Sequence, residues 1–514
     1  MVQRAEVMTR ALEKVRSVPS SSLKELFAQD PNRAEAFTQR LEWPGVEGEI
    51  GAMRVDFSKT HLDGPMLDAF EELVEAAGFV EAREALFDGQ VVNVTEGRPA
   101  NHGALRGSGS DADTEEAAAL LRRMGMLVEA IHEGAFGDVK HLIHIGIGGS
   151  ALGPALAIDA LTRDLAKVDV HVVSNIDGLA LEQAFAACDA ETTLIAVASK
   201  TFTTTETMTN ARSALAWLER EGVADPSGRV IALTANPEKA VEWGVDETRI
   251  LPFMESVGGR YSLWSSIGFP IALAIGMEEF QEFLAGAQAV DTHFREMSGR
   301  ANAPLLAAFA DQYYARVRDC QTRAVFAYDE RLALFPSYLQ QLEMESNGKS
   351  VTVEGDPVSG PTAPITWGGV GTDAQHAVFQ LLHQGTHLVP VDFIASVAPG
   401  DALDPVHHRI LLMNCLAQGA ALMAGKENSK DPARAYPGDR PSTTFLLDDL
   451  DPATLGALIA FHEHRTFANA VLMGINPFDQ FGVELGKDIA KRIDAGEGEF
   501  DPSTQALMEA AGLR

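Results

Sequence analysis

Two loops rich in glycine and hydroxyl side chains each follow an apolar run with the character of a buried strand. The segment G-I-G-G-S at 146–150 comes after the run 139–145, and a helix-forming stretch follows directly. The segment S-K-T-F-T-T-T-E-T at 199–207 comes after the run 193–198. Backbone N–H groups of such loops approach a ligand closely at the positive end of a helix. Together the loops predict a site for a small phosphorylated ligand.

Other interpretations of these loops stay open. The pattern G-x-G-x-x-A over 146–151 fits a relaxed dinucleotide fingerprint, which would indicate a nicotinamide-dependent dehydrogenase. That fingerprint expects an acidic residue at the end of the next strand, and Asp177 comes slightly too late. A purely structural turn is the third interpretation. In the second loop, capping of a helix by Thr204 or Thr205 explains one or two hydroxyls but not the whole cluster.

Further segments place charged groups beside glycines. They are G-G-R-Y-S at 258–262, E-S-N-G-K at 345–349, W-G-G-V-G-T-D-A-Q-H at 367–376 and F-D-Q-F-G-V-E-L-G-K at 478–487. Glycines before Arg260 allow its guanidinium to stabilise negative charge on a ligand oxygen. Taken singly, each group has an ordinary explanation. Arg260 would pair with a structural carboxylate, His376 would be a core or surface histidine, and Lys487 would be solvated.

Composition restricts the class of protein. A chain of 514 residues is too long for one core, so two or more domains are expected. The formal charge of −32 disfavours nucleic acid and anionic membranes as partners. Three cysteines without metal-type spacing indicate small core residues of a reducing compartment. The first 27 residues lack a secretion signal, and the longest apolar stretch, 267–277, is too short for a bilayer. We therefore expect a cytoplasmic protein.

Short apolar runs alternate with helical patterns from residue 139 onward, which is typical of βαβ units and parallel sheets. The predicted strands are 139–145, 168–173, 194–198, 230–233 and 249–251, then 324–328, 364–367, 388–394 and 470–474. The predicted helices are 151–163, 179–187, 206–220, 236–243, 331–344, 373–384, 406–423, 453–466 and 483–493. We expect a helical extension over 1–105, a first α/β domain over 106–280, and a second α/β domain with C-terminal helices over 281–514.

Taken in order, the chemical segments resemble the glucose-6-phosphate isomerase (phosphoglucose isomerase) family. The similarity comprises G-I-G-G-S, S-K-T-F-T-T-x-E-T, G-G-R-Y-S, E-S-N-G-K, Q-H-A-x-x-Q-L-x-H-Q-G and F-D-Q-x-G-V-E-x-G-K. The resemblance implies an α/β fold with two sugar-isomerase (SIS) type domains, each a mostly parallel sheet flanked by helices, with N- and C-terminal helical extensions. It also implies a homodimer with active sites near the subunit interface, and no metal or other cofactor. The implied reaction interconverts D-glucose 6-phosphate and D-fructose 6-phosphate through a cis-enediol intermediate.

Motif matching carries the family's roles onto residues of this chain. The implied substrate-binding residues are Gly149, Ser150, Ser199, Lys200, Thr201, Thr204, Gly259 and Gln480. Ser199, Thr201 and Thr204 would bind phosphate, with Lys200 contributing mainly its backbone. Arg260 matches the arginine that stabilises the enediolate, and Lys487 matches the lysine that helps to open the sugar ring.

One departure from the family pattern affects the catalytic base. Many members have a glutamate where this chain has Gly369, and a glycine cannot move a proton. This chain better resembles another branch of the family, which takes its glutamate from the E-S-x-G-K turn and its histidine from the position of His376. That resemblance implies Glu345 as the base and His376 as the ring-opening partner, with Glu206 and Asp373 as alternatives for the base. The same departure keeps open a sensor that binds sugar phosphates without turning them over.

Overall fold

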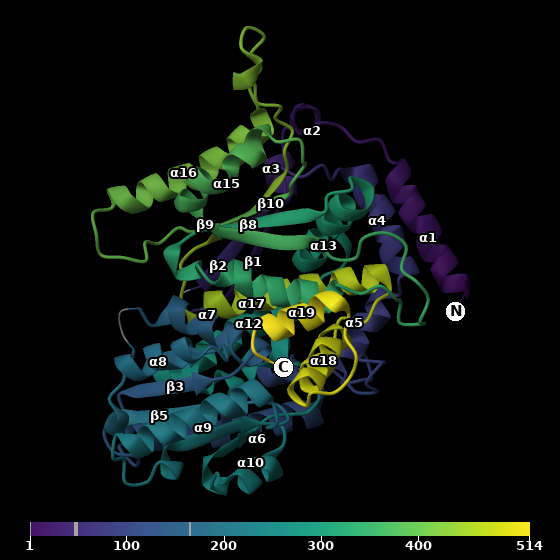
Figure 1. Ribbon diagram of the computed structural model, residues 1–514. Coiled ribbons are helices and arrows are strands. Elements are labelled where there is room, and N and C mark those ends of the chain that lie inside the picture. Colours follow the sequence, from purple (N-terminus) through teal and green to yellow (C-terminus); the bar gives the residue numbers. More distant parts are fainter. Residues whose placement is uncertain (1, 46–49, 164–165, 514) are drawn as a thin grey trace. The chain divides into compact units, whose positions relative to one another are not determined.

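Two separate β-sheets organise most of the chain (Figure 1). The structure is a computed structural model that describes residues 2–45, 50–163 and 166–513. The chain divides into two units, Met1–Pro477 and Phe478–Arg514, and both sheets belong to the first. Each unit is described by itself.

The first sheet has five parallel strands in the order β4-β3-β5-β6-β7. They are β3 (His141–Ile145), β4 (Asp169–Val173), β5 (Thr193–Ala198), β6 (Val230–Thr234) and β7 (Ile250–Pro252). The crossover helices are α7 (Leu152–Leu161), α8 (Gly178–Ala187), α9 (Thr205–Arg220) and α10 (Pro237–Trp243). All five predicted strands and four predicted helices of this region are confirmed. Every residue of β5 is buried, as expected for a strand covered on both faces.

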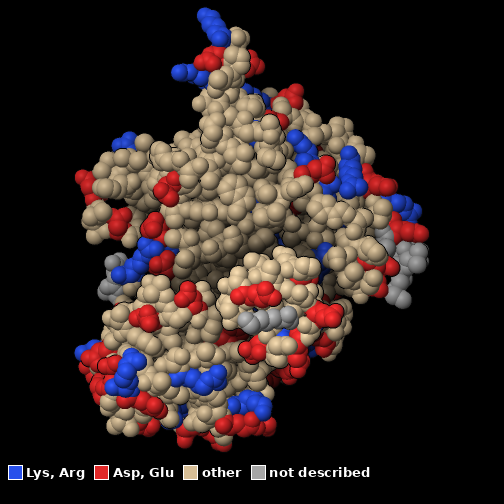
Figure 2. Space-filling view, in the orientation of Figure 1, with Lys and Arg blue, Asp and Glu red and all other residues tan. Residues whose placement is uncertain are grey.

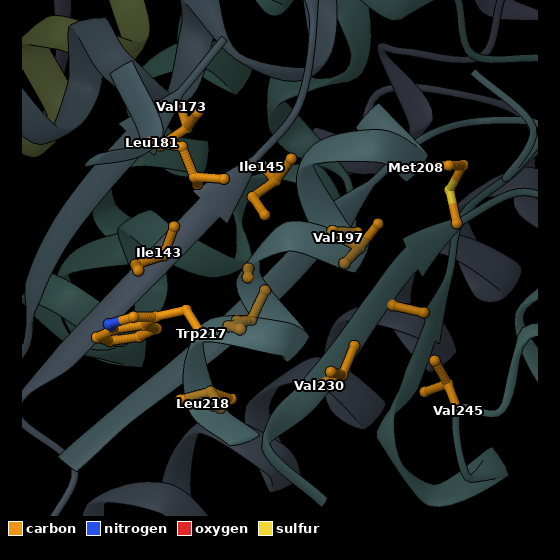
Figure 3. Close-up of a cluster of buried hydrophobic side chains, with 14 of the residues drawn as sticks. Ile143, Ile145, Val173, Leu181, Val197, Met208, Trp217, Leu218, Val230 and Val245 are labelled. Carbon is orange, nitrogen blue, oxygen red and sulfur yellow. The ribbon is translucent and has the colours of Figure 1, made fainter. Parts of the chain in front are cut away.

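One face of this sheet packs under α8 and α9 (Figure 3). Alternate strand residues such as Ile143, Ile145 and Val197 are fully buried there. Trp217 of α9 belongs to the same core and stacks on Phe185 of α8, with 4.5 Å between ring centroids. Each such aliphatic side chain contributes roughly 1.5–3 kcal/mol when buried. The core therefore fixes the strand ends from which the two predicted phosphate loops leave.

The second sheet has six strands in the order β1-β2-β11-β10-β8-β9. The parallel strands are β8 (Thr322–Tyr328), β9 (Ile365–Val370), β10 (Val391–Ser396) and β11 (Ser442–Leu447). The strands β1 (Thr38–Pro44) and β2 (Ile50–Asp56) are antiparallel, and β2 joins the edge of β11. The helices α15 (Gly371–Gln384) and α16 (Val406–Ala424) pack on this sheet. The expectation of two mostly parallel sheets with flanking helices is confirmed.

The structure corrects one strand prediction in this region and adds one strand that was not predicted. The segment 470–474 is not a strand, because it is the end of the buried helix α17 (Pro452–Met473), which Gly474 terminates at φ 68°. A short apolar run does not distinguish a strand from a buried helix. Strand β11 at Ser442–Leu447 was missed, since its polar first half hides its character. The N-terminal extension is also not purely helical, because β1 and β2 interrupt it.

The remaining helices of the first unit are α1 (Val2–Ser17), α2 (Leu23–Gln29), α3 (Arg33–Ala36), α4 (Gly64–Ala76), α5 (Phe79–Phe87), α6 (Asp111–His132), α11 (Phe269–Ile275), α12 (Met277–Glu296), α13 (Ala303–Gln312) and α14 (Phe335–Leu339). The second unit contains α18 (Glu484–Asp494), which confirms the helix predicted at 483–493, and α19 (Pro502–Ala510). Among the helices of the described residues, none has the length and apolar content that a bilayer crossing requires. The domain boundaries at 105 and 280 stay a prediction.

A buried ionic cluster connects α12 and α17 with the segment before α6. Arg106 donates to Asp291, with Nη2 2.6 Å from Oδ1, and also to Glu463. Trp264 Nε1 donates to the other oxygen of Glu463 at 2.8 Å, and His464 Nε2 lies 2.6 Å from Asp291. Burial lowers the pKa of Arg106, but the two carboxylates outweigh burial and raise it overall. Arg106 is therefore paired with two carboxylates in the interior of the protein.

Replacing Arg106 by methionine tests this cluster. The substitution leaves Asp291 and Glu463 buried without their cation, which should destabilise the protein by about 3–5 kcal/mol. The measurement is the free energy of unfolding in urea. Arg300→Met is the control, because Arg300 pairs with Asp68 and Glu71 at the surface, where ion pairs contribute about 0–1 kcal/mol. Equal losses in both variants would contradict the structural role of Arg106.

Candidate active site

The first predicted phosphate loop is held to the strand that it follows. Residues Gly148–Ser150 form a 3₁₀ turn between β3 and α7, and Gly148 has a φ of +55° that favours glycine. His144 is buried in β3, and its Nε2 lies 2.7 Å from the Ser150 carbonyl oxygen. Burial lowers the pKa of His144 to about 4. The imidazole is therefore neutral, and it donates from Nε2 to hold the loop.

The loop touches a second segment through backbone alone. A Cβ atom added to Gly149 would overlap the Gly259 carbonyl carbon and the Arg260 backbone nitrogen. Gly259–Trp264 is a buried 3₁₀ segment, so the neighbouring peptide has little room to move. The structure thus brings together Gly149, Gly259 and Arg260, three of the predicted site residues that lie far apart in the sequence.

The second loop gathers hydroxyl groups at the start of α9. Ser199 Oγ lies 3.1 Å from Thr204 Oγ1, and Thr201 Oγ1 lies 2.8 Å from Thr203 Oγ1. Thr204 occupies the N-cap position, but its side chain makes no capping hydrogen bond. Helix capping therefore does not account for these hydroxyls. Hydroxyl and backbone N–H groups gathered in this way suit phosphate oxygens.

Lys200 connects this loop with the segment that leads to Arg260. Its Nζ donates to the backbone carbonyls of Glu255 and Val257, at 2.6 and 3.1 Å. Burial, and then the positive charge of Arg98, lower the pKa of Lys200 to about 8. The Lys200 side chain therefore holds the two segments together.

Arg260 and Glu345 lie side by side. The Arg260 guanidinium is buried, and its Nη1 lies 3.5 Å from Glu345 Oε2. Nε donates to Ser346 Oγ at 2.7 Å, and Nη2 donates to the Pro477 carbonyl. The Glu345 side chain keeps 22% of its surface exposed. A fixed cation thus lies beside a carboxylate that a ligand can reach.

Glu345 differs from its neighbour Glu343. Both belong to a π-helical segment, Gln340–Glu345, which continues α14. Glu343 is buried, pairs with Arg323 and accepts from Thr366 Oγ1 at 2.6 Å. Burial raises the pKa of Glu343, but Arg323, His462 and Arg465 together outweigh burial and lower it overall. Glu343 is therefore a structural carboxylate, whereas Glu345 retains access to solvent.

The other candidate acids and bases are placed differently. Glu206 lies in the first turn of α9, and Asp373 and His376 are exposed on α15. Among the described residues, neither Asp373 nor His376 is joined to Arg260 by a hydrogen bond or ion pair. A Cβ atom on Gly369 would meet Ala374 only at an ordinary 3.7 Å, so the missing glutamate is not explained by crowding.

Two predicted residues belong to the second unit. Gln480 precedes a 3₁₀ turn at Phe481–Val483, and Lys487 lies on α18. Their roles remain predictions.

The acidic residue considered for a dinucleotide site, Asp177, has a structural role. Its side chain accepts a hydrogen bond from the Leu179 backbone N–H and caps α8.

Sequence reasoning missed two side chains that shape this site. Ser346 joins Arg260 to Tyr261, whose hydroxyl lies 2.9 Å from Ser346 Oγ. Gln341 approaches the first loop, because a Cβ atom on Gly148 would lie 3.1 Å from Gln341 Nε2. Ser346 was inside a recognised motif, but Gln341 lies before it. Gln341 lies on the π-helical segment, and such segments often occur at functional sites. The π-helical conformation is visible only in the structure, so no sequence pattern indicated Gln341.

The fold and the site define the class of protein. Two mostly parallel sheets with flanking helices, a hydroxyl-rich anion loop and an arginine beside a reachable carboxylate are typical of enzymes that move protons on sugar phosphates. Comparisons with known proteins agree. The family model described as Phosphoglucose isomerase matches residues 56–508. The chain belongs to the phosphoglucose isomerase family.

Individual relatives match over nearly the whole chain. Glucose-6-phosphate isomerase of Erythrobacter litoralis is 70% identical, over 99% of this chain and 100% of that protein. Glucose-6-phosphate isomerase of Zymomonas mobilis is 61% identical, over 98% and 97%. The crystal structure of a glucose-6-phosphate isomerase from Chlamydia trachomatis superposes with a TM-score of 0.88, at 30% identity and 99% coverage of both chains.

Gly149→Ala tests the backbone contact that assembles the site. The added methyl group must displace the Gly259–Arg260 peptide, and such overpacking typically costs about 1–3 kcal/mol. The measurement is the thermal unfolding midpoint, which should fall. Gly178→Ala is the matched control, since a Cβ atom there meets nothing within 4 Å. An unchanged midpoint in Gly149→Ala would show that this contact is not tight.

Proposed function

We propose that the chain catalyses the reversible isomerisation of D-glucose 6-phosphate to D-fructose 6-phosphate, a step of glycolysis and gluconeogenesis. The observation that carries the proposal is the pairing of buried Arg260 with partly exposed Glu345, at 3.5 Å. Membership of the phosphoglucose isomerase family supports the choice of substrate. The proposed mechanism is acid/base catalysis through a cis-enediol intermediate.

Phosphate binding is assigned to the hydroxyl-rich loop. Ser199, Thr201 and Thr204 would donate to the phosphate oxygens, together with N–H groups at the start of α9. The chain carries a formal charge of −32, so long-range attraction does not favour an anionic substrate. Local donors in a fixed loop therefore have to provide the affinity. The backbone of Lys200 adds to them, while its ammonium group holds the loop.

Proton transfer is assigned to the Glu345 carboxylate. It would remove the proton from C2 of the open-chain sugar and return it to C1, while the proton of the C2 hydroxyl passes to the C1 oxygen. A positioned general base typically contributes about 10²–10⁴-fold to the rate. Arg260 would stabilise the negative charge that develops on the enediolate oxygens. This chemistry requires no metal and no nucleotide.

Ring opening requires a proton donor and an acceptor at the ring oxygen and the anomeric hydroxyl. We assign it to His376 and Lys487, and we assign contacts with the sugar to Gly149, Ser150, Gly259 and Gln480. These assignments rest on the family motifs.

Glu345→Gln tests the base. The amide keeps the size of the side chain but cannot accept the C2 proton, so turnover should fall at least about hundredfold. Binding of fructose 6-phosphate should persist, because the phosphate loop is untouched. The measurements are a coupled assay of fructose 6-phosphate conversion in the presence of EDTA, and calorimetric titration of binding.

The rival carboxylates provide matched controls for that test. Glu206→Gln and Asp373→Asn should retain most of the activity. Near-normal turnover in Glu345→Gln, with a large loss in either control, would move the base to that residue. If the unmodified chain binds sugar phosphate without turnover, it is a sensor, as the glycine at position 369 first suggested.

We also propose a homodimer with active sites near its interface. Val406, Ile410, Met413 and Leu416 recur at helical spacing on α16 and are 47–57% exposed. Few charged side chains cover the surface over α15 and α16 (Figure 2). Exposed apolar faces of this kind mark protein interfaces. A partner on this face would also approach the exposed His376, since Gln375 Nε2 donates to Asn414 Oδ1 at 3.2 Å and ties α15 to α16.

A cytoplasmic location completes the proposal. Cys188, Cys320 and Cys415 are free thiols in the structure. Unpaired cysteines are typical of a reducing compartment. The substrate proposed here, a phosphorylated sugar of central metabolism, is consistent with that location.

The double substitution Ile410→Glu with Leu416→Glu tests the dimer. Two buried carboxylates would disfavour association strongly, so sedimentation should show a monomer where the unmodified chain is a dimer. The rate of isomerisation should also fall in the monomer if His376 acts near the interface. Val91→Glu is the control, because Val91 is 55% exposed in a separate loop. A dimer that survives the double substitution would place the interface elsewhere.

A further inference from the structure

Three metal-ligating side chains meet at the amino-terminal edge of the first sheet. His141 begins β3, His171 lies in β4, and Cys188 follows α8. One ligand atom of each residue lies within 4.8 Å of the other two. The sequence did not reveal this group, because its members come from three elements and have no motif spacing. The fold alone brings them together.

The pairing of β3 with β4 explains why the two histidines lie close together. β3 and β4 are parallel neighbours, with His141 opposite Asp169 and Ile143 opposite His171. Side chains alternate along a strand, so both histidines share the face on which Ile143 and Val173 enter the core. The same face is covered by α8, whose last turn leads into Cys188. The three side chains therefore lie at one end of the apolar core beneath α8.

The two imidazoles have unsatisfied nitrogens. His141 Nδ1 and His171 Nε2 are buried and have no hydrogen-bond partner in the structure. The rings lie 5.9 Å apart between centroids. A buried polar atom without a partner is costly, and such atoms in folded proteins call for an explanation. A cation that accepts both lone pairs would satisfy them.

We propose that His141, His171 and Cys188 form a zinc(II) site. Two imidazole nitrogens and one thiolate sulfur are a ligand set that Zn²⁺ prefers. Ideal distances of about 2.0–2.3 Å place tetrahedral ligands roughly 3.3–3.8 Å apart, so small side-chain rotations from 4.8 Å suffice. The fourth position would be taken by water or by Asp169. The strongly acidic chain favours the approach of a cation.

Nucleophilic catalysis by the Cys188 thiol is a less favourable interpretation of these three residues than metal binding. Burial raises the pKa of Cys188 to about 11, and a thiol that stays protonated is a poor nucleophile. A bound metal overcomes this penalty by displacing the thiol proton, since its ligand is the thiolate.

The site is separate from the candidate active site. The loops at 146–150 and 199–207 leave the carboxyl ends of β3 and β5, whereas His141 lies at the amino end of β3. The intervening strand spans roughly 13 Å. Zinc would clamp the end of α8 to β3 and β4, so it should stabilise the fold without competing with sugar phosphate.

The test uses the full-length chain after removal of metal by a chelator. Zn²⁺ is titrated against a chromophoric chelator, and Co²⁺ is used as a spectroscopic substitute. We expect one tight site per chain, a thiolate-to-cobalt charge-transfer band, and a higher thermal unfolding midpoint with Zn²⁺. Cys188→Ser and His171→Asn should each weaken binding at least about hundredfold, and Cys188→Ser should abolish the band.

Matched controls separate this site from adventitious binding. Cys415→Ala removes a buried cysteine of α16, and His407→Asn removes an exposed histidine of the same helix. Both substitutions should leave zinc affinity unchanged. Equal affinity in Cys188→Ser and the unmodified chain, or a loss in His407→Asn as large as in His171→Asn, would overturn the proposal. If a variant fails to fold, the cobalt spectrum of the unmodified chain still decides, because a spectrum without the thiolate band overturns it.

Discussion

The contact between the Gly149 backbone and the Gly259–Arg260 peptide is the constraint on which the candidate site depends. No side chain separates the two segments, so any Cβ atom at position 149 would displace the peptide that carries Arg260. The guanidinium in turn reaches Glu345 and Ser346, which come from a third segment. Lys200 attaches the hydroxyl-rich loop to the same region through the Glu255 and Val257 carbonyls. One tight backbone contact thus aligns an anion loop, a cation and a carboxylate.

The carboxylates that lie beside arginines differ in how completely they are buried and paired. Asp291 and Glu463 are fully buried around Arg106, and Glu343 is buried against Arg323. Carboxylates enclosed in this way are held in one ionisation state and do not exchange protons with a ligand. Glu345 is close to its arginine but remains 22% exposed. Its partial exposure leaves the carboxylate within reach of a ligand, which is what proton transfer requires.

The sequence predicted the first sheet well because its strands are continuous apolar runs with regular spacing. It failed where the signal was ambiguous, at the helical segment 470–474 and at the threonine-rich strand β11. Within the site, short motifs identified Arg260, Glu345 and both loops, since each motif is local. Gln341 and the His141–His171–Cys188 group escaped, because their proximity depends on the helical phase of a π-segment and on strand register. Neither is encoded in a linear pattern.

The parallel sheet also explains how one domain can support two kinds of chemistry. In parallel strands all carboxyl ends lie at one edge and all amino ends at the other. The carboxyl edge carries loops rich in glycine, serine and threonine, whose neutral donors suit a phosphorylated sugar. The amino edge carries His141, His171 and Cys188, whose nitrogen and sulfur atoms suit a metal. The strand between the two edges spans roughly 13 Å. This is longer than the Debye length of about 8 Å at physiological ionic strength, so salt largely screens a cation at one edge from an anion at the other. The two functions are therefore expected to be coupled through stability rather than through charge.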